Sequence, residues 1–309
     1  MTKTASRITD QLVEHDRFNR IKDEITNNVL GRARGNDPQI LPVIGPTRVG
    51  KTTLLNQFLR EQAIACPETR EVIQVVSPKH LTGRALPDAC LASIGMSPSF
   101  FKNQATATDA LIRALERLGT RLIIFDETQH LLERSSSTTI RAAADFLKHL
   151  FDQAGVSMVL AGLPTLTGLF SANEQLADRA RCPAEYYPYY WEGADYKSFR
   201  AALAGALEFL RETGWETFAF NDADFARRMY IATAGRYGLI NKLFMEVQAG
   251  ISTQKAALYP EFAGAYQKVV VARWLEFNPF DQRQQTQTEH MALAYTQVMR
   301  EAGVVVKPC

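Results

Sequence analysis

The sequence has few cysteines, and none are spaced as metal ligands. Only four of its 309 residues are cysteine, and they are scattered without a CxxC pair: Cys66, Cys90, Cys182 and Cys309. Such spacing argues against both a zinc site and a disulfide framework. We therefore expect the protein to work in a reducing compartment.

Long apolar runs and an excess of charge of one sign are also missing. No segment approaches the roughly 18 apolar residues that a membrane helix requires, and the first residues mix charges where a signal peptide would be apolar. We expect a soluble, cytoplasmic protein without a membrane partner. The formal net charge is only +2, so a basic surface would have to come from local clustering.

The composition that remains is ordinary for a globular protein, with 46% hydrophobic and 22% charged residues. Short apolar runs at 40–44, 72–76, 122–125 and 157–161 alternate with amphipathic, helix-like stretches. This alternation predicts an α/β fold in which helices cover both faces of a parallel sheet. Pro42 lies inside the first run and removes a backbone donor, so we expect that strand to be short or irregular.

The flanking segments follow other patterns. Residues 8–30 have a loosely helical spacing, residues 31–38 suggest a polar linker, and helical stretches follow Asp195 at 199–210, 225–232, 239–247 and 266–277. After residue 278 the chain is polar, with a last possible helix at 289–301, and we assign it no packed role. We predict an N-terminal extension and linker (1–38), an α/β nucleotide-binding domain (39–194), a smaller all-helical domain (195–278) and a C-terminal tail (279–309).

A phosphate-binding loop follows the first apolar run. Its eight residues are Gly45, Pro46, Thr47, Arg48, Val49, Gly50, Lys51 and Thr52. The two glycines let backbone N–H groups surround phosphate oxygens, Lys51 supplies positive charge, and Thr52 offers a hydroxyl to Mg²⁺. The following helix, from Thr53, adds the positive end of its dipole. We predict that the loop binds ATP and magnesium, since a chance match in a Gly-containing loop would lack the strand and helix around it.

Two acids, Asp126 and Glu127, follow the apolar run at 122–125, and Asp126 lies 75 residues beyond Lys51. Asp126 is placed to hold Mg²⁺, and Glu127 is placed to orient or deprotonate the attacking water. The alternative is a solvated turn, which the alternating α/β pattern disfavours. The pair therefore predicts ATP hydrolysis in addition to binding.

Arginines are the expected further catalysts, because negative charge develops on the γ-phosphoryl oxygens. Arg179 and Arg181 are candidates, although either one could be a surface residue paired with Asp178. Arg236 opens a later helix and could reach the nucleotide, the alternative being an exposed helix-start residue.

The remaining candidates are less specific. His130 is more typical of a structural group than of a catalyst, and Gln129 could sense the γ-phosphate or couple to a neighbour. The aromatic run 186–191 has strand-like propensity and indicates packing rather than base stacking. Basic residues between the second and third runs could position a DNA backbone, or could be ordinary loop residues: Lys79, His80, Arg84 and Lys102.

Three short motifs add a family resemblance: Asp126-Glu127-Thr128-Gln129-His130-Leu131-Leu132, Gly162-Leu163-Pro164-Thr165, and Asn173-Glu174-Gln175-Leu176-Ala177-Asp178-Arg179. With the order of elements, they resemble the AAA+ ATPases and, more narrowly, the TniB/TnsC group of DNA-transposition regulators. The likeness covers about residues 10–250.

The resemblance implies an AAA+ domain followed by a helical lid, with Arg179 as the finger that acts on a neighbouring subunit and Arg236 as the second sensor. The first sensor stays open, with Thr165 as a candidate, because Ala161 and Gly162 stand where many AAA+ proteins carry a polar residue. It also implies ATP-dependent self-assembly into rings or helical filaments on double-stranded DNA, linking a target-selection protein to a transposase. Hydrolysis would then disassemble or remodel that platform.

Two other functions are compatible with these residues. One is a replication initiator or helicase loader, although residues 250–309 show no clear helix-turn-helix of the kind that initiators carry. The other is a nucleotide-gated scaffold that hydrolyses little ATP. Oligomer number, the identity of the partners and the nucleotide state that favours DNA are left open.

Overall fold

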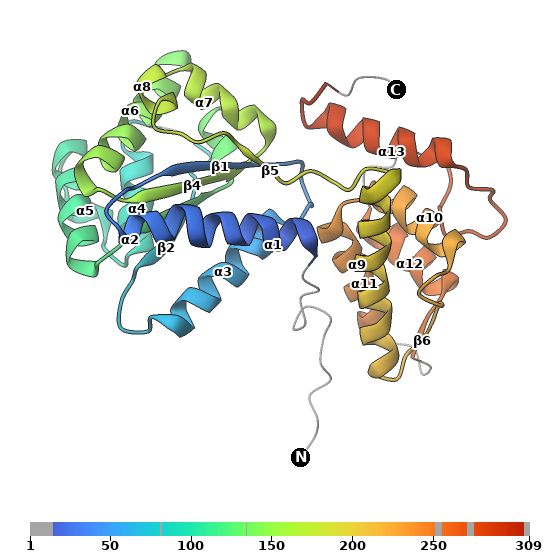
Figure 1. Cartoon of the computed structure of the whole chain (residues 1–309). Helices are drawn as coiled ribbons and strands as arrows, with labels where there is room; N and C mark the ends of the chain where they lie inside the picture. Colours follow the sequence, from blue (N-terminus) through green and yellow to red (C-terminus); the bar gives the residue numbers. More distant parts are fainter. Residues whose placement is uncertain (1–14, 81, 134, 251–254, 271–274, 306–309) are drawn as a thin grey trace. The chain divides into compact units, whose positions relative to one another are not determined.

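The computed structural model describes residues 15–80, 82–133, 135–250, 255–270 and 275–305 (Figure 1). The chain divides into two compact units. The α/β unit consists of residues 20–46 and 51–186, and the helical unit consists of 1–19, 47–50 and 187–309. Within the part of the chain that is described, no helix combines the length and apolar character needed to cross a membrane.

Five parallel strands form the sheet of the α/β unit in the order β2-β3-β4-β1-β5. They are β1 (Ile40–Ile44), β2 (Val72–Val76), β3 (Leu122–Asp126), β4 (Ser157–Gly162) and β5 (Ala184–Glu185). Every residue of β1, β3 and β4 is buried, which explains why these strands are continuous apolar runs without alternation. The predicted α/β fold with a parallel sheet is confirmed.

Helices surround this sheet (Figure 1). They are α3 (Lys51–Ala65), α4 (Ala85–Ser93), α5 (Gln104–Leu118), α6 (Ser137–Ala154), α7 (Gly168–Ser171), α8 (Glu174–Ala177) and the 3₁₀ turns η2 (Pro98–Phe100), η3 (Thr128–Leu131) and η4 (Pro164–Thr167). Their ends follow from sequence: Asn103 and Ser136 cap the first turns of α5 and α6 through their side chains. Gly119 and Gly155 end the same two helices in the left-handed conformation.

The strand that contains Pro42 is regular and as long as β2 and β3, so the expectation of a short or irregular strand is wrong. All five residues of β1 pair in register with β4. The bonds to β4 come from Gln39 O and Gly45 N, whereas Ile40 O and Ile44 O face the segment 181–186. Alternate residues of a strand bond to opposite neighbours, and Pro42 lies on the same side as Ile40 and Ile44. Its nitrogen therefore points away from β4 and toward the side of β5, which pairs only with Val43 and Ile44. The lost donor therefore costs no bond to β4.

The N-terminal segment is helical beyond the predicted linker boundary. Helix α1 (Asp16–Asp23) continues as a π-helix, η1 (Glu24–Leu30), and then as α2 (Gly31–Arg34). Gly31 keeps ordinary right-handed angles, so the glycine does not end the helix, and the non-helical segment begins only at Gly35. Ile25 and Val29 are fully buried, which anchors this segment in the α/β unit.

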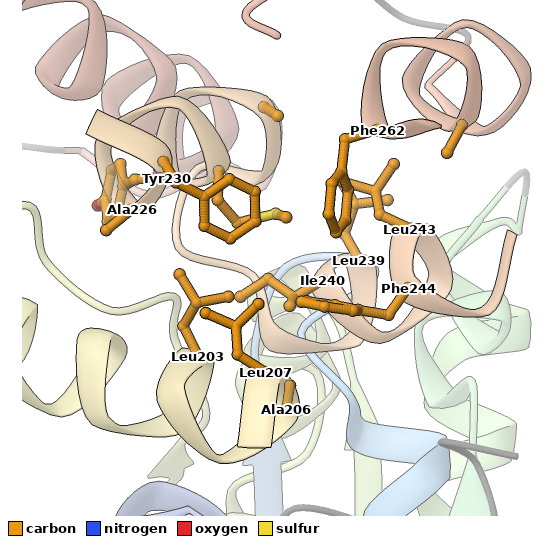
Figure 2. Packing of buried hydrophobic residues seen from close by; sticks show 14 of the residues in the cluster. Leu203, Ala206, Leu207, Ala226, Tyr230, Leu239, Ile240, Leu243, Phe244 and Phe262 are labelled. Atoms are coloured by element: carbon orange, nitrogen blue, oxygen red, sulfur yellow. The ribbon is translucent and has the colours of Figure 1, made fainter. Parts of the chain in front are cut away.

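The helical unit has one large aromatic and aliphatic core (Figure 2). Its elements are α9 (Gly193–Glu212), α10 (Ala223–Thr233), α11 (Tyr237–Ala249), α12 (Tyr259–Val269), α13 (Thr288–Glu301) and the short strands β6 (Glu216–Thr217) and β7 (Ala256–Ala257). Leu203 and Leu207 of α9 lie near Ile240 and Phe244 of α11 in Figure 2. The start of the helix expected over 266–277 belongs to α12, which begins earlier, with proline in its first turn, whereas residues 271–274 of that expectation lie outside the described residues.

The aromatic run 186–191 is not a strand, because β5 covers only Ala184–Glu185. Tyr189 is buried in the core of the helical unit, where its hydroxyl lies 2.6 Å from Nδ1 of His15. The predicted packing role is therefore confirmed for this residue, and the predicted strand is not.

The segment that begins at residue 279, to which its polar composition led us to assign no packed role, is packed. Phe280 is buried in the core of the helical unit. The buried guanidinium of Arg228 donates to the carbonyl oxygens of Pro279, Asp281 and Gln284 at 2.7, 3.0 and 3.0 Å. One arginine of α10 thus satisfies three backbone acceptors of a segment that has no regular structure of its own.

Candidate active site

The phosphate-binding loop joins β1 to α3, which begins at Lys51. Gly50 has a φ of 112°, a value that only glycine adopts freely, and Arg48 has a left-handed φ of 64°. These angles turn the chain sharply before the helix starts. The predicted order of strand, loop and helix is present, so the N-terminus of α3 presents its free N–H groups to a bound anion.

Lys51 points its ammonium group back at the loop. Its Nζ donates to the carbonyl oxygens of Gly45 at 2.7 Å and Pro46 at 2.9 Å. Burial lowers the pKa of Lys51 to about 8, against the opposing pull of the Glu127 and Asp126 carboxylates. A bound phosphate group would stabilise the charged ammonium form of Lys51, which burial disfavours.

Thr52 and Asp126 bring a hydroxyl and a carboxylate together. Thr52 Oγ1 donates to Asp126 Oδ2 at 3.0 Å, and the backbone N–H of Glu127 donates to Oδ1 at 2.9 Å. Burial raises the pKa of Asp126, partly offset by these two hydrogen bonds. Hard oxygen ligands at this spacing suit Mg²⁺, and a divalent cation would compensate for the buried carboxylate, so the residues fit the expected ion.

Glu127 follows with a backbone conformation that is unusual for its type. Its φ of 54° and ψ of 36° are left-handed, where a side chain other than glycine is strained. The side chain is half-buried, and its carboxylate accepts a hydrogen bond from the Gln129 amide. Glu127 and Asp126, the predicted magnesium ligand, thus lie at the same edge of the sheet.

Gln129 is the residue whose role the sequence did not resolve. Its amide nitrogen donates to the Glu127 carboxylate, and its carbonyl oxygen accepts from the backbone N–H of Leu163 at 3.1 Å. The sequence contains both partners of this contact, but in two separate motifs, Asp126–Leu132 and Gly162–Thr165. Only the pairing of β3 with β4 brings the two motifs together. Thr165, the candidate for the first sensor, is exposed in η4.

The two finger candidates are held by different acids, and neither contact is with Asp178. Arg179 binds Asp152 of α6 through two nitrogens, at 2.7 and 3.0 Å. Arg181 pairs with Glu24 of η1 at 2.9 Å. The role of Arg179 toward a neighbouring subunit stays a prediction.

Arg236 is buried, so the alternative of an exposed helix-start residue is wrong. It precedes α11 and is 6% exposed, and its Nε donates to the carbonyl of Thr233 at 2.9 Å. Burial lowers the pKa of Arg236 to about 10, and the nearby charge of Arg48 adds to this effect. The Glu301 carboxylate opposes this shift, and the sensor role of Arg236 stays a prediction.

The candidate DNA residues differ in how freely they can reach a ligand. Lys79, His80 and Lys102 are exposed. Arg84 is half-buried, forms an ion pair with Asp88 at 3.0 Å and donates to the carbonyl of Pro98. Its charge is thus already partly neutralised.

Comparison with known proteins decides the family. Residues 4–184 match the family model of the bacterial TniB protein. The chain belongs to the TniB family. The matched range includes the phosphate-binding loop, Asp126, Glu127 and Arg179, whereas Arg236 lies beyond it. No match was found among the curated proteins.

Solved structures place this TniB-family protein among the AAA+ ATPases by fold. Cdc6p from Pyrobaculum aerophilum has a TM-score of 0.61 at 10% identity, with 100% of this chain and 85% of that chain covered. The ORC2 protein of Aeropyrum pernix has a TM-score of 0.56 at 14% identity, with 87% and 70% covered. A Walker-type ATPase of Pyrococcus abyssi has a TM-score of 0.51 at 16% identity, with 87% and 74% covered. The TniB-family chain therefore has the AAA+ ATPase fold.

Proposed function

We propose that this TniB-family protein binds and hydrolyses ATP, and that its ATP-bound form assembles on double-stranded DNA to regulate transposition. The observation that carries the proposal is the meeting of Lys51, Thr52, Asp126 and Glu127 around the start of α3, with Thr52 and Asp126 3.0 Å apart. Lys51 and Thr52 of the loop and the two acids thus lie in the α/β unit of a chain whose family resemblance implies transposition.

The first task of the site would be to bind and orient the triphosphate. The loop N–H groups and Lys51 would hold the β and γ phosphates, releasing Nζ from the carbonyls of Gly45 and Pro46. Thr52 and Asp126 would hold magnesium, which when bound supplies charge that neutralises the phosphate oxygens. Positioning of this kind accounts for most catalysis of phosphoryl transfer.

Glu127 would then act on the attacking water. As the water oxygen bonds to the γ-phosphorus, the bond to the bridging oxygen breaks, ADP leaves with that electron pair, and the Glu127 carboxylate takes the water proton. Arg179 of an adjacent subunit would stabilise the charge that develops on the γ-phosphoryl oxygens. Hydrolysis would thereby depend on assembly.

Assembly on DNA extends the same proposal. The exposed Lys79, His80 and Lys102 would contact phosphates, which gives binding without sequence preference. A ring or filament built in this way would link a target-selection protein to a transposase, and hydrolysis would remove or remodel it. A replication initiator would instead prefer particular duplex sequences, and a nucleotide-gated scaffold would bind ATP with little turnover.

Glu127→Gln tests the catalytic part of the proposal. Loss of a general base typically costs 10²-fold to 10⁴-fold in rate, so turnover should fall by about 100-fold or more while nucleotide affinity stays within about twofold. The measurement is phosphate release with duplex DNA present, beside titration of a fluorescent ATP analogue. Equal turnover by wild type and variant would favour the scaffold instead.

Electron microscopy with an ATP analogue and random-sequence duplex DNA tests the assembly. A ring or filament around the DNA is the expected result. Monomers that bind nucleotide and ignore DNA would contradict it, and assembly on only one class of sequence would favour an initiator.

A further inference from the structure

Gln129 uses both ends of its amide to connect two loops of the α/β unit. The side chain is 5% exposed. Its nitrogen donates to the Glu127 carboxylate, while its oxygen accepts from the N–H of Leu163, just after β4. If the amide were reversed, its oxygen would face the Glu127 carboxylate and its N–H groups would face the N–H of Leu163. The two hydrogen bonds therefore fix the orientation of the amide.

The end of β4 is shaped to receive this amide. A Cβ at Gly162 would lie 2.6 Å from Gln129 Oε1, closer than real Cβ atoms approach, and at a tight 3.1 Å from the Gln129 backbone nitrogen. Only glycine at position 162 therefore leaves room for the side-chain carbonyl of Gln129 to accept from the backbone N–H of Leu163. This explains why an apolar strand ends in glycine where the family resemblance leads one to expect a polar sensor.

The turn that carries Gln129 is fixed independently. The Thr128 side chain is fully buried, and its hydroxyl donates to the carbonyl of Phe125 at 2.9 Å. Glu127, immediately before it, has the left-handed backbone already described. The amide thus projects from a buried, hydrogen-bonded turn toward the end of β4, and it hydrogen-bonds the Glu127 carboxylate.

We infer that Gln129 is a positioning residue, which ties the Glu127 carboxylate to the end of β4 and holds it where it can reach the attacking water. The inference rests on the proposed role of Glu127 as general base. A movement of the β4 end on nucleotide binding would pass through this amide to the carboxylate. Gln129 itself takes no proton and acts only through the Glu127 carboxylate.

Two substitutions separate positioning from simple filling of space. Gln129→Glu keeps the size and an acceptor for the Leu163 N–H, but replaces the donor to Glu127 with a like charge. Gln129→Met keeps only the size. If Gln129 positions Glu127, both should lower kcat by about 10-fold to 100-fold, as small misplacements of catalytic groups do, with ATP affinity within about twofold of wild type.

Amide hydrogen exchange provides a readout that does not depend on turnover. The Leu163 N–H should stay protected in Gln129→Glu, which keeps its acceptor, and exchange faster in Gln129→Met. His130→Gln is the matched control, because His130 lies in the same turn but its ring contacts Glu133 at 3.0 Å. It should leave kcat within about twofold of wild type.

Adding Gln129→Glu to Glu127→Gln should cause no further loss of turnover, since an effect exerted through Glu127 disappears with it. Wild-type kcat in Gln129→Glu would overturn the inference, as would a parallel loss of ATP affinity or a further loss in the double variant. If Glu127→Gln itself turns over ATP normally, the proposed general base fails instead. The isosteric Gln129→Glu carries the test should Gln129→Met fail to fold.

Discussion

A half-buried lysine and a buried aspartate lie beside the phosphate-binding loop, and burial moves their pKa values toward each other. It lowers the pKa of Lys51 to about 8 and raises that of Asp126. Each ionised form is less favourable here than in water, and each would regain favourable interactions from a phosphate or a divalent cation. Such ligands should therefore stabilise the folded protein strongly by mass action.

At the same scale, individual basic residues should differ in their effect on DNA binding. Lys79→Glu and Lys102→Glu should each weaken duplex binding and reduce the slope of log affinity against log salt by about one, because each removes a phosphate contact. Arg84→Glu should change the slope less, since Asp88 already pairs with Arg84. Fluorescence anisotropy across a salt series measures both quantities.

The control for this series is Arg141→Glu, which makes the same charge change at an exposed position of α6. It should leave the slope near the wild-type value. If Lys79→Glu and Lys102→Glu behave like this control, the DNA surface lies on other residues.

Among the elements, α1 is preceded by a histidine, His15, that is neutral in the folded protein. His15 is 7% exposed and lies against Tyr189 and Tyr237, whose ring centre is 4.5 Å from that of the histidine. Burial lowers the pKa of His15 to about 4; the Asp16 carboxylate opposes this shift and Arg17 adds to it. The helical unit therefore holds this imidazole in its uncharged form.

A pH dependence of stability follows. An unfolded chain binds a proton at His15 near the ordinary pKa of 6.5, whereas the folded chain does so only near 4. The contribution of neutral His15 to the free energy of unfolding is therefore complete above about pH 6.5. It is lost as pH falls toward 4, by up to about 3 kcal/mol. Asp16, whose pKa is held below its ordinary value of 3.8, titrates below this window.

Urea unfolding followed by tryptophan fluorescence measures this slope, because all three tryptophans fall within residues 187–309 of the helical unit. His15→Gln should flatten the dependence between pH 4 and 6.5, and His290→Gln in the same unit should keep it. Identical slopes for wild type and His15→Gln would show that other groups cause the loss.

The elements also show which features a sequence reveals. Apolar runs and the loop motif predicted β1, β3, β4 and the residues at their ends, because a buried parallel strand needs continuous apolar residues. The regularity of β1 was not predictable, since the effect of Pro42 depends on which neighbour its nitrogen faces. Contacts across long separations were hidden as well, such as Arg228 with the segment 279–284 and Gln129 with Leu163.

For the whole molecule, assembly is the property that Arg179 should control. Arg179→Ala should leave nucleotide affinity within about twofold of wild type, but weaken ATP-dependent oligomerisation and lower turnover by about 10³-fold, the lower effect typical of an arginine finger. Size-exclusion chromatography and phosphate release, carried out side by side, measure both. Arg181→Ala, which removes the pair with Glu24, is the control and should retain turnover.

Mixing two inactive variants tests whether the finger serves a neighbour. Glu127→Gln subunits keep Arg179, and Arg179→Ala subunits keep Glu127, so mixed assemblies should regain part of the wild-type turnover. No recovery on mixing, or unchanged oligomerisation and turnover in Arg179→Ala alone, would remove Arg179 from the shared site.

The left-handed backbone at Glu127 has a consequence for the engineering and evolution of this protein. Glycine would relieve a strain of about 1 kcal/mol at this turn, yet it would delete the carboxylate. Screens that reward heat resistance alone would therefore favour inactive variants at this position. The strained turn is a local compromise in which the folded state gives up some stability to keep an acid at the edge of the sheet.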